Sequence, residues 1–493
     1  MKEQENGDYS HVLKYTGLFG GVQGLSMILS LVRNKFMALL LGAGGMGFAS
    51  LLNSVQNFSS QCTNLGISFG AVPRLSELYE KGDVTGLEYF ITVIRLWSLV
   101  AAFLGLVFCI AVSSFVDEMT FTWGNHTLHY AMLAFSVAMI AITGGETAIL
   151  KATRRLGSLA KIQVSTGLVS LVVSIPLYYF LFHSGVVPVI VLMALVTMLV
   201  TMCYSYRYYP LRLKVGKRLL AEGAGMIRLG VAFVLAAVIG SAAEMLVRAF
   251  LNVEGGLADV GLYNAVYMIT FTYAGLVFSA MDSDYFPRLS AVSQDVEVTN
   301  QTVNRQIEVS LLIISPMLAG LMVMLPVLIP LLFSAEFLPI VEVTQVAILA
   351  MYMKVLTMPV AYITLARGYS MSYLLLELSY FVVFVLLIML GYWQWGIYGT
   401  GVAIVVAHVF DYVLINGYAY WKYGYRCTAS VLRYAAMQVA LGLAVFVLTC
   451  LVDGLFYWII GAALTLVSTA YSVSILHSKT HLWKSLLKRL RFS

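Results

Sequence analysis

Of the basic side chains that fall inside long apolar stretches of the sequence, where charged residues are rare, four are candidates for binding a ligand. They are Arg33, Lys35, Arg248 and Lys354. A charge at the centre of a membrane helix costs about 2.5–3.5 kcal/mol on insertion scales and normally faces a cavity or a partner. Because guanidinium and ammonium groups hold phosphate and carboxylate, these four residues predict a binding site for an anionic ligand.

Each of the four also has a purely structural interpretation. Glu244 precedes Arg248 by one helical turn and could neutralise it without any ligand. Arg33 and Lys35 could extend to the outer membrane interface, as long basic side chains near helix ends do. Lys354 could pair with an acidic residue elsewhere in the chain. The sequence alone leaves these alternatives open.

Uncharged polar side chains recur at helical spacing on the first two apolar stretches. One set is Gln23, Ser26, Ser30 and Arg33, and the other is Asn53, Asn57, Gln61 and Asn64. Steps of three and four residues place each set on one helix face. Such faces suit the hydroxyl groups of sugars, although amides also join helices to one another. We expect Gln23, Asn53, Asn57 and Asn64 to contact the ligand together with the four cations.

Ionisable groups in other apolar stretches are candidates for carrying a coupling proton or sodium ion. They are Glu146, Glu377, His408 and Asp411, of which the last two share a helix face. Buried carboxyl and imidazole groups change their protonation readily, which such coupling requires. Internal pairing with Lys354 or with tyrosine hydroxyls is the alternative interpretation.

The composition indicates the elements that position these residues. Of the 493 residues 60% are hydrophobic and 11% are charged, with a mean hydropathy of +0.87, which is typical of an integral membrane protein. We expect an all-α polytopic protein of about fourteen transmembrane helices. The expected spans are 14–40, 45–70, 91–114, 128–150, 160–183, 186–206, 226–248, 257–282, 307–333, 341–365, 371–391, 396–419, 430–451 and 454–476.

The distribution of lysine and arginine predicts the orientation. With the N-terminus in the cytoplasm, most basic residues between the spans fall on the cytoplasmic side, as does the C-terminus. The first span lacks a cleavage site and is expected to remain in the protein. The net charge of +6 is therefore topological and implies no nucleic acid partner. Residues 481–492 are expected to lie as a basic amphipathic helix on anionic lipid.

A repeat runs through the sequence at an offset of 214 or 215 residues. PRLS occurs at 73–76 and 287–290, LVR occurs at 31–33 and 246–248, and Gly47 corresponds to Gly261. Six spans separate the copies, so both enter the membrane in the same direction and form two pseudo-symmetric six-helix lobes around a central cavity. The expected domains are the first lobe with its linker, the second lobe, and a C-terminal helix pair with its tail, at 1–225, 226–425 and 426–493.

Motifs for catalysis are absent from the sequence. It has no glycine-rich phosphate loop, no paired aspartates in a loop and no nucleophile with a neighbouring base. The five cysteines lack paired or metal-type spacing, so no disulfide, metal or cofactor is expected. The two alternatives to a transporter of anionic substrates are an exporter of cationic drugs, which should present acids to its cavity, and a membrane polysaccharide polymerase, which should carry a long catalytic loop.

Four segments resemble the Wzx-type polysaccharide flippases of the multidrug/oligosaccharidyl-lipid/polysaccharide exporter superfamily. KFMALLLGAGGMG at 35–47 resembles their start, ADVGLYNAVYMIT at 258–270 their eighth helix and YFPRLS at 285–290 its end. KVLTMPVAYITLARGYSMSYLLLE at 354–377 matches them in residue type and spacing at Lys354, Arg367 and Glu377. The hairpin at 430–476 departs from the twelve helices of many members.

This resemblance implies a function and a mechanism. Such a flippase moves undecaprenyl-diphosphate-linked oligosaccharide, such as an O-antigen repeat unit, from the cytoplasmic to the periplasmic leaflet of the bacterial inner membrane by alternating access. Lys35 and Lys354 would then meet the diphosphate or an acidic sugar, and the amide faces would meet the glycan. Membrane lipids and a downstream polymerase are the expected partners.

Overall fold

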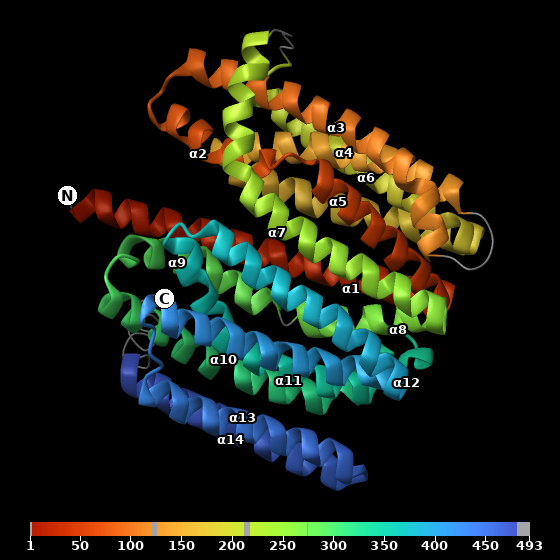
Figure 1. Ribbon diagram of the computed structural model, residues 1–493, viewed down its shortest axis with the longest axis vertical. Coiled ribbons are helices and arrows are strands. Elements are labelled where there is room, and N and C mark those ends of the chain that lie inside the picture. Colours follow the sequence, from red (N-terminus) through yellow and green to blue (C-terminus); the bar gives the residue numbers. More distant parts are fainter. Residues whose placement is uncertain (1, 121–125, 212–216, 274, 481–493) are drawn as a thin grey trace. The chain divides into compact units, whose positions relative to one another are not determined.

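The protein is a bundle of long helices (Figure 1). The computed structural model describes residues 2–120, 126–211, 217–273 and 275–480, and no strand occurs among them. The α-helices are α1 (Lys2–Thr63), α2 (Ile67–Glu80), α3 (Val84–Thr120), α4 (Thr127–Ala152), α5 (Leu156–Leu181), α6 (Val186–Tyr208), α7 (Lys217–Gly255), α8 (Leu257–Tyr267), α9 (Gly275–Val292), α10 (Val296–Leu332), α11 (Ile340–Ala366), α12 (Ser370–Tyr423), α13 (Ala429–Leu451) and α14 (Gly454–Thr480). Short segments η1 (Phe182–Gly185), η2 (Met268–Tyr273) and η3 (Ala335–Phe337) lie between them.

Ten helical segments of the described residues are long and apolar enough to cross a membrane. Three of them, Gly21–Thr63, Leu156–Tyr208 and Ser370–Tyr423, each cover all or most of two predicted spans. The predicted span 257–282 is not among the ten, because it is divided into α8, η2 and α9. The prediction of an all-α, multi-pass membrane protein is confirmed. The predicted tail helix at 481–492 lies outside the described residues.

Glycine kinks explain two of these three cases, those in α1 and α12. Within α1 the backbone leaves the helical conformation at Gly42, where φ is 65°, and within α12 it does so at Gly396, where φ is 58°. Glycine adopts positive φ without the steric penalty of a side chain, so the chain turns sharply at these points without a loop. The kink thereby divides α1 into two helical halves that run in different directions.

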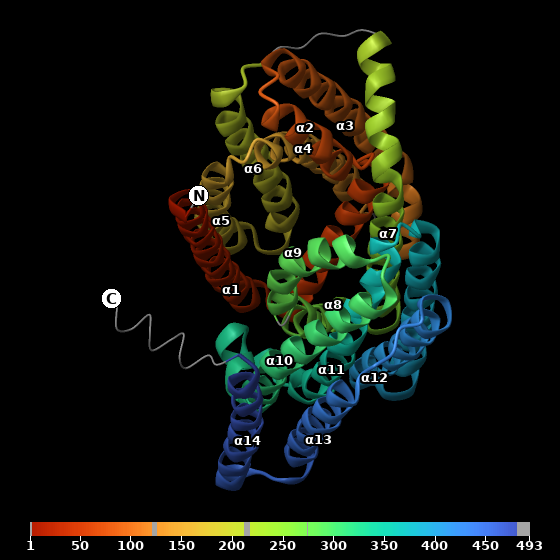
Figure 2. The same ribbon diagram turned by 90° about the vertical axis from the view of Figure 1, so that its left-hand side faces the viewer.

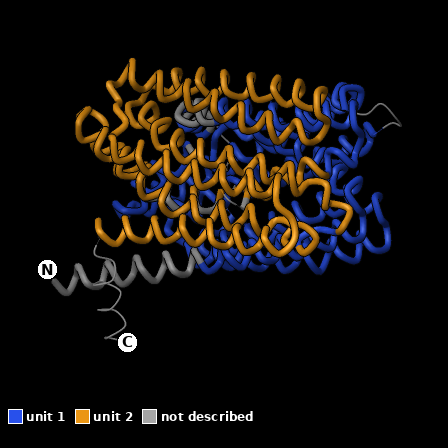
Figure 3. Tube along the Cα trace, turned by 90° about the horizontal axis from the view of Figure 1, so that it is seen from below, with its two compact units in different colours: residues 1–261, 332–334 blue, residues 262–331, 335–493 orange. Residues whose placement is uncertain are grey.

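The chain forms two compact units (Figure 3). Unit 1 comprises 1–261 with 332–334, and unit 2 comprises 262–331 with 335–493. Within unit 1, α1 contacts α4 and α5, and α6 contacts α4 and α5 in turn. These four helices therefore form a closed ring, which Figure 2 shows end-on. The lobe boundary predicted at residue 225 from the repeat stays a prediction.

Backbone geometry repeats at the offset found in the sequence. Three pairs of residues with positive φ lie 214 positions apart, namely Gly42 with Gly256, Arg154 with Gly368, and Phe182 with Gly396. Phe182 (φ 50°, ψ −131°) and Gly396 (φ 58°, ψ −143°) share a conformation that is unusual for a bulky side chain. Since no sequence similarity requires Phe182 to adopt it, the shared geometry supports an ancestral duplication.

The two copies touch each other through equivalent glycines of unit 1. A Cβ atom added to Gly47 would lie 1.8 Å from the carbonyl oxygen of Leu257, and one added to Gly261 would lie 1.9 Å from that of Ala43. Gly47 and Gly261 are repeat mates, and so are Ala43 and Leu257. The same contact is therefore made twice, in the manner of a two-fold interface. Only glycine permits such a close backbone approach.

We expect Gly47→Ala to destabilise the protein by about 1–3 kcal/mol, the usual cost of forcing extra volume into a packed site. The added methyl group meets backbone, which cannot move aside as a flexible side chain would. Gly44→Ala is the matched control, because nothing lies within 4 Å of a Cβ atom built there. Thermal unfolding of the detergent-purified variants measures the difference. Equal melting temperatures for the two variants would contradict the close contact.

Candidate functional site

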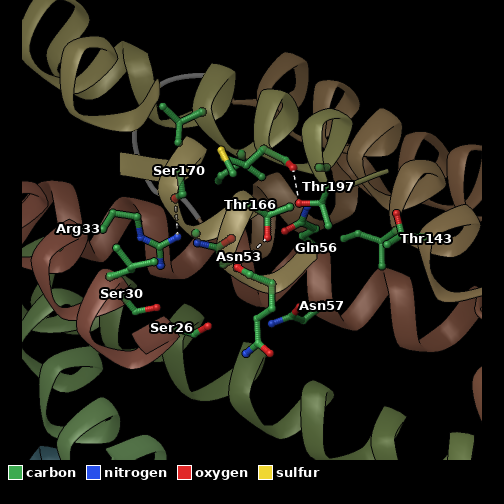
Figure 4. Close-up of a pocket in the computed structure, with 18 of the residues that line it drawn as sticks. Ser26, Ser30, Arg33, Asn53, Gln56, Asn57, Thr143, Thr166, Ser170 and Thr197 are labelled. Atoms are coloured by element: carbon green, nitrogen blue, oxygen red, sulfur yellow. Dashed lines mark hydrogen bonds between the residues drawn. The ribbon is translucent and has the colours of Figure 1, made fainter. Parts of the chain in front are cut away.

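Unit 1 contains an open cavity of about 810 Å³ (Figure 4). Its walls come from both halves of α1, from Ser68 of α2, and from α4, α5 and α6. Most of its polar lining is uncharged: Ser26, Ser30, Asn53, Gln56, Asn57, Ser68, Thr143, Thr147, Gln163, Thr166, Ser170, Tyr178 and Thr197. The charged lining residues are Arg33 and Lys151, and no carboxylate is among the described residues that line the cavity. The cavity is thus neutral to basic and rich in hydrogen-bonding groups.

The structure brings most of the predicted α1 residues to this cavity. Ser26, Ser30 and Arg33 line it from the first half of α1, and Asn53 and Asn57 line it from the second half. The kink at Gly42 is what turns the two faces toward one space. The amphipathic spacing of the sequence therefore identified one side of the cavity.

Two predicted contacts of α1 lie differently. Gln23 is not a lining residue, but its side-chain oxygen accepts a hydrogen bond of 3.0 Å from Gln163, which is one. Asn64 lies at the end of α1, where it accepts from the backbone N–H of Gly66 at 2.8 Å and donates to Gln61 at 2.8 Å. The side chain of Asn64 shapes the turn into α2, and its predicted role in binding stays untested.

The opposite wall, from α4, α5 and α6, was missed by the sequence interpretation. The sequence does contain a pattern that indicates this wall, because Thr143, Thr147 and Lys151 follow one another at four-residue steps on α4. Gln163, Thr166 and Ser170 do the same on α5 at steps of three and four. Threonine and serine are common in membrane helices, so such a face stands out only when the opposite wall is known.

Hydroxyl groups on this wall are arranged to accept hydrogen bonds. The Oγ1 atoms of Thr143, Thr166 and Thr197 each donate to the helix carbonyl four residues earlier, at 2.8, 2.8 and 2.7 Å. Their remaining capacity is as acceptors. Asn53 likewise donates to the carbonyl of Ala49 at 2.8 Å and keeps its side-chain oxygen free to accept. The cavity therefore suits a ligand that carries several hydroxyl donors.

Arg33 supplies a positive charge at one side of the cavity. Its Nη1 lies 3.4 Å from Ser170 Oγ, and among the described residues no carboxylate forms an ion pair with it. A single neutral hydroxyl leaves most of the five guanidinium N–H donors available. The geometry fits a bidentate contact with a carboxylate or phosphate.

The other two predicted cations of unit 1 have protein partners. Arg248 is buried; its Nε donates to Ser50 Oγ at 2.8 Å, and its Nη1 lies 3.2 Å from a carboxylate oxygen of Glu244. This is the neutralising pair that the spacing had suggested. Lys35 donates to the carbonyl of Phe333, just beyond the end of α10. Neither residue lines the cavity, and their predicted ligand contacts stay predictions.

Glu146 is held in a buried ion pair. Arg95 Nε lies 2.8 Å and Arg95 Nη2 3.2 Å from its two carboxylate oxygens, and Ser205 also donates to it. Arg95 further donates to the carbonyls of Tyr209 and Pro210 at 2.8 and 3.0 Å. Every arm of this network ends on a protein atom, and the partner of Glu146 is Arg95 rather than Lys354 or a tyrosine. The predicted role of Glu146 in ion coupling stays a prediction.

Unit 2 gathers the remaining predicted residues into one cluster. Lys354 of α11 lies within electrostatic range of Glu377, His408 and Asp411, all three of α12. Its ammonium lies 5.5 and 5.7 Å from the ring centres of Phe271 and Phe278. His408 Nδ1 is 2.9 Å from the carbonyl of Ile404. Four residues that were predicted separately from the sequence thus lie in one cluster.

This cluster occupies the repeat-equivalent position of the unit 1 cavity. At the offset of 214 its members Lys354, Glu377, His408 and Asp411 correspond to Ile140, Gln163, Ala194 and Thr197. All four of these counterparts line the cavity. The same part of the duplicated fold is therefore neutral and open in one copy and ionisable in the other.

Comparison with known families decides the relationship. The model of the polysaccharide biosynthesis protein family matches residues 36–342, which is more than half of the chain. The chain belongs to this family. No curated protein sequence matches it. Family membership fits the sugar-compatible lining of the cavity and the segments compared in the sequence.

The fold of this family member is shared with membrane transporters. The lipid II flippase MurJ in an inward closed conformation matches with a TM-score of 0.70 and 12% identity over 94% of this chain and 99% of that chain. An inward-facing multidrug resistance MATE family transporter of the MOP superfamily matches with 0.67 and 14% over 85% and 96%. A Vibrio cholerae MATE transporter matches with 0.56 and 15% over 86% and 98%. At such identities the likeness establishes the fold alone.

Proposed function

We propose that this chain is a flippase of the Wzx type, which moves undecaprenyl-diphosphate-linked oligosaccharide repeat units from the cytoplasmic to the periplasmic leaflet. The observation that carries the proposal is the unit 1 cavity, with its mostly uncharged hydrogen-bonding walls and two basic lining residues, Arg33 and Lys151. Membership of a polysaccharide biosynthesis family supports the sugar, and the transporter fold supports the movement.

The cavity supplies what a headgroup needs in order to leave water. A glycan crossing the hydrocarbon core must exchange its hydration for other hydrogen bonds, because unsatisfied polar groups cost several kcal/mol each. The acceptors on α4, α5 and α6 accept hydrogen bonds from sugar hydroxyls, and Arg33 binds an acidic group of the headgroup. The polyprenyl chain stays in the lipid throughout.

Movement follows alternating access, in which the loaded cavity opens first to one side of the membrane and then to the other. In this proposal the protein lies in the bacterial inner membrane, and the bias of basic residues predicts that both termini are in the cytoplasm. A polymerase that uses the delivered repeat unit is the expected downstream partner.

The cluster of unit 2 is the candidate for coupling transport to an ion gradient. Two carboxylates, Glu377 and Asp411, face one ammonium, that of Lys354. With a neutral His408, one proton or one monovalent cation balances the remaining charge. A site that gains and loses a single positive charge is what coupling requires.

Asp411→Asn is expected to make translocation independent of an imposed proton or sodium gradient, because the cluster then no longer needs a balancing cation. The measurement is the translocation rate in proteoliposomes with and without each gradient. Glu342→Gln serves as the control, since Glu342 is an exposed acid of the same unit that lies outside the cluster. A variant that still responds to the gradient as the wild type does would remove Asp411 from the coupling site.

An exporter of cationic drugs is the alternative that the fold allows, but the described lining of the unit 1 cavity contains no acid to attract a cation. Reconstitution separates the two functions. Proteoliposomes that contain the protein should move a fluorescent undecaprenyl-diphosphate oligosaccharide and leave a cationic dye where it is. Movement of the dye alone would overturn the proposed function.

A further inference from the structure

A group of basic side chains outside the cavity lies where α5 begins and α6 ends. Arg155 is the N-cap residue of α5, Lys161 lies in the second turn of α5, and Arg207 lies in the last turn of α6. All three are within electrostatic range of the hydroxyl group of Tyr208, the last residue of α6. We call these three cations around one aromatic ring the basic cluster. None of its residues lines the cavity.

The protein itself holds the basic cluster together. The guanidinium carbon of Arg155 lies 4.3 Å from the ring centre of Tyr208, and Ser158 donates a hydrogen bond to the Tyr208 hydroxyl at 3.4 Å. Beyond the ring, the carbonyl of Tyr209 accepts a hydrogen bond of 2.8 Å from the buried Arg95. The end of α6 is therefore anchored to the interior of unit 1, and its ring forms a fixed surface for the cations.

The charges of the basic cluster are not neutralised within the described part of the chain. No described carboxylate forms an ion pair with Arg155, Lys161 or Arg207, whereas the neighbouring Arg154 pairs with Glu80. The Nε of Arg155 is buried and makes no hydrogen bond with any described residue. Since a buried donor without an acceptor is costly, this guanidinium lacks a partner that the fold does not provide.

The second copy of the repeat provides a comparison at the same place. Its helix α12 begins at Ser370, 214 positions after Leu156, the first residue of α5. The two N-cap residues also share a backbone conformation, with φ −79° and ψ 49° at Arg155 and φ −84° and ψ 62° at Tyr369. The offset of 214 therefore gives the counterpart of each residue of the basic cluster.

The second copy inverts the arrangement of cations and rings. The counterparts of Arg155, Lys161, Arg207 and Tyr208 are, in order, Tyr369, Leu375, Trp421 and Lys422. The ammonium of Lys422 lies 5.6 Å from the ring centre of Tyr369 and 5.9 Å from that of Trp421. Because a ring face attracts a cation, two rings satisfy the single charge of the second copy. In the first copy one ring serves three cations, and the excess positive charge calls for an anion.

The surroundings of the basic cluster suit the headgroup of a lipid. The first backbone N–H groups of a helix lack acceptors within the helix and add to the positive potential. No described atom lies within 4 Å of a Cβ atom built on Gly157, so the space beside the first turn of α5 is open. Exposed apolar side chains follow along α5 and α6, among them Leu168, Val172 and Leu199. The predicted orientation places the basic cluster at the cytoplasmic surface of the membrane.

We propose that the basic cluster binds the phosphate group of a membrane lipid. Guanidinium and ammonium groups match the oxygens of a phosphate, and basic sites between membrane helices at the cytoplasmic side bind anionic headgroups in this way. The lipid chains lie against the apolar surface of α5 and α6. The phosphate belongs either to a bulk anionic phospholipid or to a polyprenyl diphosphate carrier, and the site stands whether or not the chain is a flippase.

Thermal unfolding of the detergent-purified full chain tests the site, with the melting temperature followed as lipid is added. The probes are dioleoylphosphatidylglycerol, undecaprenyl diphosphate and inorganic phosphate. Dioleoylglycerol is the control lipid, since it has the same acyl chains as the first probe and no phosphate. Arg155→Gln and Arg207→Gln are the test variants. Arg154→Gln is the matched control, because it removes an adjacent arginine whose charge is already paired with Glu80.

We expect a saturable rise in melting temperature with the phosphate lipids. The half-saturating concentration should be about tenfold higher in each test variant, which corresponds to about 1.4 kcal/mol of binding free energy. Arg154→Gln should bind lipid as the wild type does. Tighter binding of undecaprenyl diphosphate would assign the site to the polyprenyl carrier, and tighter binding of phosphatidylglycerol would assign it to bulk lipid.

Four results would overturn the proposal. They are an equal rise with dioleoylglycerol, saturation by inorganic phosphate at the same concentration as by lipid, unchanged lipid binding in both test variants, and a loss in Arg154→Gln as large as theirs. The melting temperatures without lipid show whether each variant is folded. Because no step of the assay requires translocation, failure of the site and failure of the proposed flippase activity are distinguished.

Discussion

Replacing Arg33 by glutamine is expected to reduce translocation of a lipid-linked oligosaccharide by about 10- to 100-fold, since a hydrogen bond to a charged group contributes about 1.5–3 kcal/mol. Arg33 lies among neutral side chains, and its nearest polar contact is Ser170 Oγ at 3.4 Å. No carboxylate of the described residues pairs with it, so folding does not depend on its charge. The measurement is the initial translocation rate in proteoliposomes at equal protein content.

Two further variants separate binding from general damage. Arg33→Lys keeps the charge but loses the planar, two-point contact, and it should retain part of the rate. Arg154→Gln removes an exposed arginine that pairs with Glu80 outside the cavity, and it should leave the rate unchanged. If Arg33→Gln transports at the wild-type rate, the cavity does not hold an anionic group at this arginine.

Removing Arg95 is expected to destabilise the protein by about 3–5 kcal/mol, the cost of leaving a buried charge without its partner. Arg95 is 5% exposed and Glu146 is 2% exposed, so water cannot replace the lost guanidinium. Arg95→Met also leaves the carbonyls of Tyr209 and Pro210 without their donor. We expect a lower melting temperature and a lower yield of folded protein.

The double variant Arg95→Met with Glu146→Leu tests whether the charge left behind causes the loss. Apolar residues of similar volume often replace a buried ion pair with little cost, so the double variant should be more stable than Arg95→Met alone. Arg154→Met is the control, because its pair with Glu80 is solvent-exposed and contributes little. A double variant less stable than Arg95→Met would show that Glu146 stabilises the protein through other contacts, such as that with Ser205.

Hydropathy was sufficient to predict the helices because the membrane requires about twenty apolar residues for each span, whatever the partner helices are. Merging of neighbouring spans was not predicted, since it depends on one residue at each junction. At Gly42 and Gly396 a positive φ takes the place of a loop. A glycine in an apolar stretch does not by itself indicate whether the backbone will adopt positive φ there.

Half of the candidate site could be predicted for a similar reason. Helical spacing is a local property, so Ser30, Arg33, Asn53 and Asn57 could be placed on faces of one helix pair. The pairing of side chains from different helices, in contrast, is not a local property of the sequence. Arg95 and Glu146 lie 51 positions apart on α3 and α4, and nothing in the sequence of either segment indicates that the two side chains pair. The sequence therefore showed which side chains were costly to bury, and the fold showed which of them already had partners.

The contact between Gly47 and Gly261 has a genetic consequence. Equivalent atoms of the two copies meet there, as they do across the axis of a symmetric homodimer. In a homodimer encoded by one gene, every substitution appears in both subunits. Once the copies are joined in a single chain, each one mutates alone. Gln163 can then stay neutral while its counterpart becomes Glu377. Joining the copies in one chain therefore allows equivalent positions of the two halves to carry different side chains.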